Sequence, residues 1–97
     1  MPTYIILASY TDQGIRSVKE TPKRQEAGKK MLKGMGAELK AIYLTMGAYD
    51  WVNVVEAPND EVVTKFVLSV CSAGNIRTTT LKAFTEAEYK KIIAGLP

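Results

Sequence analysis

Apolar positions along the chain form four short runs that are typical of strands. Residues 3–9 are rich in β-branched and aromatic side chains and are too short for a helix of the usual length. Residues 37–46 and 51–57 form two further runs, separated by the turn-forming segment Gly47-Ala48-Tyr49-Asp50. Two such runs joined by a short turn containing Gly and Asp predict a β-hairpin. A threonine-rich run over residues 76–84 predicts a fourth strand.

Helical spacing appears in the segments between and after these strands. Thr21-Pro22 is a helix start signal, and apolar residues at helical spacing follow it as far as Gly36, a C-cap candidate. Asn59 precedes a second apolar stripe, which ends at Gly74. Thr85-x-x-Glu88 is a capping box that begins a short C-terminal helix. One or two helical turns are also expected between the first strand and Thr21.

The order strand, helix, strand, strand, helix, strand predicts a ferredoxin-like βαββαβ fold of the α+β class. Right-handed crossovers place both main helices on one face of a four-stranded antiparallel sheet. We expect the fourth strand at an edge, beside the second.

The opposite face of the predicted sheet would be uncovered in a single chain. Ala41 and Tyr43 alternate with Ile42 and Leu44, so both faces of the second strand are apolar. A sheet with one face in water normally alternates apolar and polar residues. We therefore predict a homo-oligomer, a dimer that closes sheet face to sheet face.

Length and composition limit the organisation of the protein. A chain of 97 residues predicts a single domain, residues 1–97. No apolar run approaches the ~18 residues of a membrane span, so no membrane partner is expected. Residues 1–4 lack the basic start of a signal peptide, and one cysteine, Cys71, cannot form an intrachain disulfide. These features predict a cytoplasmic protein.

The chain contains no histidine. This excludes catalytic triads built on histidine, and one cysteine supplies too few ligands for a structural zinc site within one chain. We predict no metal and no cofactor, and the sequence identifies no catalytic residue. Acid–base chemistry would fall to Asp, Glu, Tyr or Lys.

The net charge of +3 is concentrated in residues 16–40, which hold eight basic and three acidic side chains. Such a segment could bind anions, or it could be a solvated helix surface. No aromatic residues alternate with these lysines and no glycine-rich phosphate loop precedes them, so we predict no nucleic-acid partner.

Three blocks of the sequence resemble the GYD family of small bacterial and archaeal proteins. They are Gly47-Ala48-Tyr49-Asp50 with the apolar strand after it, the segment from Gly74 to Phe84, and the start Tyr10-Thr11-Asp12-Gln13-Gly14-Ile15. The resemblance covers roughly residues 3–88. It implies a ferredoxin-like, dimeric α+β barrel-type fold and implies no known activity.

Four polar residues are candidates for ligand binding: Tyr49, Asp50, Arg77 and Glu56. Asp50 could be a base or anchor with Tyr49 as proton donor, or it could accept backbone N–H groups at the turn. Arg77 could bind an anion or pair with a carboxylate, and we expect it in one cluster with Asp50. Glu56 could project into a pocket or lie exposed at the strand end.

Two classes of function remain open. The first is binding of a small molecule in a pocket between the sheet and the helices or at the subunit interface. The second is a non-catalytic oligomeric interaction or assembly module. A sheet face that is fully packed with apolar side chains would favour the second, and a polar cavity with unfilled volume that holds Asp50, Glu56 or Arg77 would favour the first.

Overall fold

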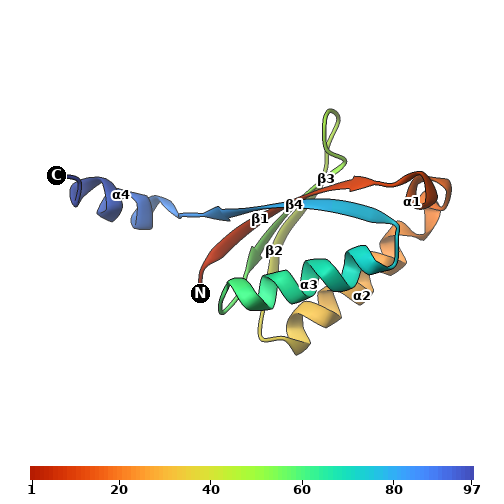
Figure 1. The fold of residues 1–97 in the computed structure, drawn as a ribbon, viewed down its shortest axis with the longest axis horizontal. Coiled ribbons are helices and arrows are strands. Elements are labelled where there is room, and N and C mark those ends of the chain that lie inside the picture. Colours follow the sequence, from red (N-terminus) through yellow and green to blue (C-terminus); the bar gives the residue numbers. More distant parts are fainter.

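The computed structural model describes residues 1–97 and contains a four-stranded antiparallel sheet in the order β2-β3-β1-β4 (Figure 1). The sheet therefore has β3 and β1 at its centre and β2 and β4 at its edges. The strands are β1 (Thr3–Tyr10), β2 (Glu38–Leu44), β3 (Trp51–Glu56) and β4 (Ile76–Ala83).

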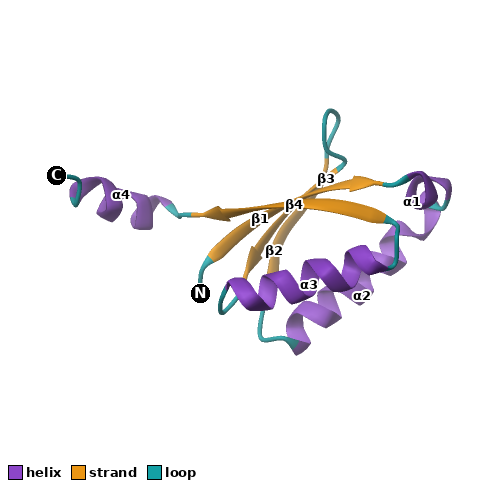
Figure 2. Cartoon of the chain, in the orientation of Figure 1, coloured by secondary structure: helices purple, strands orange, loops and turns teal.

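Two long helices, α2 (Thr21–Gly34) and α3 (Asp60–Ser72), lie side by side on one face of the sheet (Figure 2). A short helix α1 (Asp12–Arg16) and a 3₁₀ helix η1 (Val18–Glu20) connect β1 to α2. The chain ends in α4 (Glu86–Ala94). None of these helices is long and apolar enough to cross a membrane.

The α+β class and the four antiparallel strands agree with the prediction, but the expected neighbour of β4 is wrong. The crossover through α3 carries the chain from β3 past β1, so β4 pairs with β1 and not with β2. The element order also includes α1 and η1 in addition to the two main helices.

The helix boundaries show which capping predictions hold. Asn59 caps α3 by accepting the N–H of Val62 at 3.0 Å, and Thr85 forms the predicted capping box with Glu88. Thr21 is not an N-cap, because α2 already begins there and Glu20 precedes it without a side-chain cap.

The core lies between the sheet and the helices. Along β1, Tyr4, Ile6 and Ala8 are buried on the helix side, in keeping with the two-residue period of a strand. The buried cluster joins β1 and β3 to both long helices. Its members are Tyr4, Ile6, Leu32, Ala37, Val55, Ala57 and Val63.

The other face of the sheet carries no helix (Figure 1). Ile5 pairs with Val54 and Leu81, and Leu7 pairs with Val52, at positions that alternate with the buried ones. We call this surface the open sheet face. Its apolar residues are Ile5, Leu7, Tyr43, Val52, Val54 and Leu81, of which Tyr43 is 61% exposed and Leu81 47%.

Candidate ligand-binding site

A cavity of about 440 Å³ lies between the helix side of the sheet and helices α2 and α3. Fourteen of its 23 lining residues are hydrophobic, among them Ile42 of β2, Leu32 of α2 and Phe66 of α3. This volume and lining match those of pockets that hold small organic molecules.

Several of the residues that line the cavity are small. They are Ala27 and Gly28 of α2, Ser69 of α3, and Ala73, which follows the end of α3. A Cβ atom built on Gly28 would lie 3.9 Å from Cζ of Phe66, an ordinary van der Waals contact, so a methyl group fits at this position. Packing that is dense at Leu32 and Val55 is therefore interrupted further along the helices.

Trp51, the single tryptophan of the chain, lines the cavity from the first residue of β3. Its indole Nε1 is buried and has no hydrogen-bond partner. A buried N–H without an acceptor is costly, so this group lowers the stability of the folded chain.

Three other polar side chains of the lining, those of Asn53, Tyr10 and Thr21, are hydrogen-bonded within the chain. The Nδ2 of Asn53 donates to the carbonyl oxygen of Ile6 at 3.1 Å, and the hydroxyls of Tyr10 and Thr21 are hydrogen-bonded to each other at 2.6 Å. These bonds tie the side chains to β1 and α2, so that they form fixed walls.

Two basic residues and no acidic residue line the cavity. Nζ of Lys29 is 3.0 Å from the carboxylate of Glu26 on the same helix. Arg24 is half-buried, and its Nη2 donates to the neutral Oγ of Ser17 at 2.8 Å. The ion pairs of the chain do not include Arg24.

The hairpin residues Asp50 and Tyr49 lie outside this cavity. A carboxylate oxygen of Asp50 accepts the N–H of Tyr10 at 2.9 Å, and the Asp50 N–H donates to the carbonyl oxygen of Ala8 at 2.9 Å. The carbonyl oxygen of Tyr49 accepts the Thr45 hydroxyl at 2.6 Å. These bonds attach the hairpin turn to the end of β1.

The structure does not bring the four predicted ligand-binding residues into one cluster. Arg77 pairs with Ser9 near the end of β1, whereas Glu56 pairs with Thr3 near its beginning, about 20 Å away at the rise of a strand. Asp50 and Arg77 flank β1 from opposite sides and form no ion pair. Neither Arg77 nor Glu56 lines the cavity.

Sequence reasoning missed the residues that do line the cavity, above all Trp51 and Arg24. One signal was present in β3, where Asn53 interrupts an apolar run and faces the helices. The small residues of α2 and α3 that line the cavity, such as Gly28 and Ser69, were a second signal.

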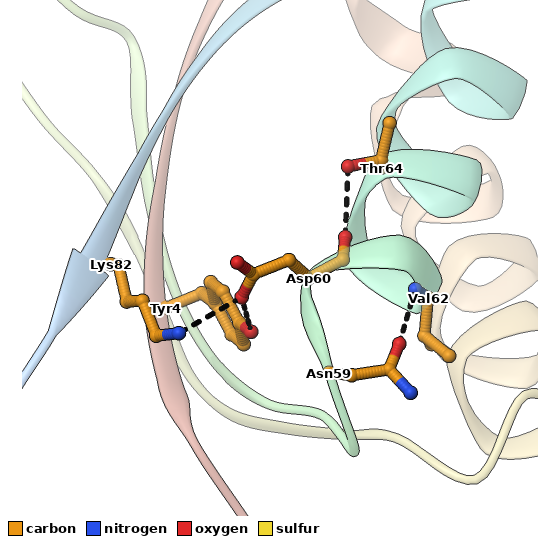
Figure 3. A network of polar contacts seen from close by, with 6 residues as sticks. All are labelled: Tyr4, Asn59, Asp60, Val62, Thr64 and Lys82. Atoms are coloured by element: carbon orange, nitrogen blue, oxygen red, sulfur yellow. Dashed lines mark hydrogen bonds and ion pairs between the residues drawn. The ribbon is translucent and has the colours of Figure 1, made fainter.

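A separate polar cluster fixes the start of α3 to the sheet (Figure 3). The Tyr4 hydroxyl donates to Oδ1 of Asp60, the first residue of α3, and Nζ of Lys82 in β4 lies 3.1 Å from the same oxygen. Burial and the hydrogen bond to Asp60 raise the pKa of Tyr4 to about 12. The hydrogen bonds from Tyr4 and Lys82 lower the pKa of Asp60.

These shifts predict how stability changes with pH. Asp60 contributes stability above its ordinary pKa of 3.8, and the contribution is lost as pH falls through its lowered pKa. Tyr4 contributes stability below its ordinary pKa of 10.0, and the contribution is lost as pH rises toward about 12. We expect Tyr4→Phe to lower stability at neutral pH and to weaken the loss of stability at both extremes, measured by urea unfolding from acid to alkaline pH.

Tyr89→Phe is the matched control for this experiment, because Tyr89 lies in α4 and is 42% exposed. Its pH profile should coincide with that of the unmodified protein. Parallel profiles for Tyr4→Phe and the unmodified protein above pH 10 would contradict the proposed role of the Tyr4–Asp60 bond.

The chain belongs to the GYD domain family, whose sequence profile matches residues 4–93. The resemblance inferred from the three sequence blocks is thereby confirmed.

Individual proteins are also similar to this chain. A protein of Thermus thermophilus named "Glutamine synthetase and cystathionine beta-lyase binding protein" is 36% identical over 89 residues, which cover 91% of this chain and 94% of that protein. The crystal structure of FFRP-DM1 superposes on this chain with a TM-score of 0.57 and 26% sequence identity. The match covers 87% of this chain and 100% of FFRP-DM1.

A further similarity concerns the fold alone. The crystal structure of MtbAldR has a TM-score of 0.67 at 15% identity, with 88% of this chain covered. This chain spans about half of MtbAldR, 52% of its length.

Proposed function

We propose that this protein is a binding protein that holds a small, mainly apolar molecule between its sheet and its helices. The observation that carries this proposal is the apolar cavity of about 440 Å³ between the sheet and the two long helices, which fourteen hydrophobic residues line. A ligand that fills the cavity would remove its apolar walls from water. The name of the Thermus relative, a binding protein for two enzymes, also supports a role in binding.

Octan-1-ol, a neutral molecule with an apolar chain and one acceptor, tests this proposal. Trp51 reports binding directly, because its fluorescence comes from the wall of the cavity. We expect a saturable change in Trp51 fluorescence with a stoichiometry of one. The variant Gly28→Leu, which directs a side chain into the cavity, should weaken binding about ten-fold or more, as expected when a ligand loses apolar contacts.

Gly34→Leu is the matched control, since Gly34 is the last residue of α2, has open space around its Cβ position and does not line the cavity. Its affinity for octan-1-ol should equal that of the unmodified protein. A response that does not saturate, or equal affinities for the two leucine variants, would overturn the proposal.

We also propose that the open sheet face binds a second copy of this chain, giving a homodimer. Its apolar side chains cross all four strands, and burying them would remove a large apolar surface from water. Glu56 and Arg77 lie on the same side of the sheet, at opposite ends. Ligand binding by these two residues and by Tyr49 and Asp50, at such an interface, stays a prediction.

The single cysteine, which has no partner for an intrachain disulfide, supports the further proposal that the protein acts in the cytoplasm.

A further inference from the structure

Resting on the proposed cavity function, we infer that the ligand is a monocarboxylic acid with an apolar body, and that Arg24 binds its carboxylate. The charges of the lining support this assignment, and they are independent of the volume of the cavity.

The positive charge of Arg24 has no carboxylate partner within the chain. A guanidinium group is always protonated in proteins, and this one is half-buried at the cavity wall. Its partner within the chain is the neutral hydroxyl of Ser17. A carboxylate placed here would supply the missing negative charge and could accept two parallel N–H bonds, the geometry that a guanidinium favours.

The lining holds one basic side chain that is not paired with a carboxylate. Lys29, the other basic residue of the lining, is already paired with Glu26, which leaves one unpaired cation for the ligand. Arg24 would balance the single negative charge of a carboxylate ligand. A doubly charged phosphate ester would instead bring a second negative charge into the apolar cavity without a cation to pair with it.

The lining favours simple carboxylic acids over amino acids, because it offers no partner for an ammonium group. No Asp or Glu lines the cavity, so no side chain there could hold an α-ammonium group as an ion pair. A zwitterion would have to give up the hydration of its ammonium group without that compensation. The apolar part of the lining, including Phe66, Ile42 and Leu32, suits a hydrocarbon chain or ring.

Three molecules of equal chain length test the inference: octanoate, octan-1-ol and 2-aminooctanoate. Affinities are measured by Trp51 fluorescence and by calorimetry at pH 7. We expect octanoate to bind about ten-fold or more tightly than the other two, in keeping with the strength of a hydrogen bond between charged groups. Arg24→Gln should remove this advantage, so that octanoate and octan-1-ol bind the variant with similar affinities.

Arg16→Gln is the control, because Arg16 is exposed in α1 and does not line the cavity. It should bind octanoate as the unmodified protein does. Equal affinities for octanoate and octan-1-ol, or an octanoate affinity that Arg24→Gln leaves unchanged, would overturn the carboxylate inference while leaving the cavity function in place. Failure of all three molecules to bind would overturn the proposed function itself.

Discussion

Replacing Gly14 with alanine is expected to lower the free energy of unfolding by about 3 kcal/mol, the upper end of the usual cost of overpacking. A Cβ atom at this position would lie 1.9 Å from the carbonyl oxygen of Asn75, which is a backbone atom and cannot rotate away. The same oxygen accepts the N–H of Thr11 at 3.0 Å. Thr11 also donates its hydroxyl to the carbonyl oxygen of Gly74 at 2.6 Å.

The clash would therefore separate two loops that hold each other, the one after β1 and the one before β4. Gly34→Ala is the control, because a Cβ there meets nothing within 4 Å. It should raise stability by about 0.5 kcal/mol through the lower entropy of the unfolded chain. Chemical denaturation measures both variants, and a Gly14→Ala variant as stable as Gly34→Ala would show that the loops are not held together as described.

Replacing Val54 with lysine is expected to make the protein a monomer. Val54 lies in the central strand β3 and pairs with Ile5 on the open sheet face. In the proposed dimer each copy would bury an unpaired ammonium group, which should weaken association roughly 100-fold or more. Sedimentation at micromolar concentration distinguishes the two states.

Leu68→Lys is the control for association, because Leu68 lies in α3 on the helix side of the sheet and is 66% exposed. It should sediment as the unmodified protein does. A monomeric unmodified protein, or a Val54→Lys variant that still dimerises, would contradict the proposed use of the open sheet face.

The local signals in the sequence were sufficient for the elements but not for their arrangement. The caps at Asn59 and Thr85 depend on residues three positions apart, and the structure confirms both. The place of β4 depends on how far a crossover carries the chain, which no local pattern encodes. Thr21 shows the same limit, because its hydroxyl is bonded to Tyr10, a residue in another element.

The candidate site was harder to predict because a cavity is a property of what neighbouring elements leave empty. Side chains at the hairpin tip drew attention through their chemistry, yet Asp50 is engaged by the backbone of β1. Arg24 looked like one of many basic residues on a solvated helix. Its position against the cavity depends on the way α2 packs on the sheet.

The edges of the sheet bear on how the protein avoids uncontrolled aggregation. The pairing of β2 with β3 shifts register between Leu39 and Ala41, which leaves Lys40 as an extra residue on an outer strand. A bulge and a lysine on an edge strand both hinder the addition of a further strand from another molecule. The opposite edge, β4, carries Lys82. Growth into a continuous intermolecular sheet through the β2 edge is therefore disfavoured.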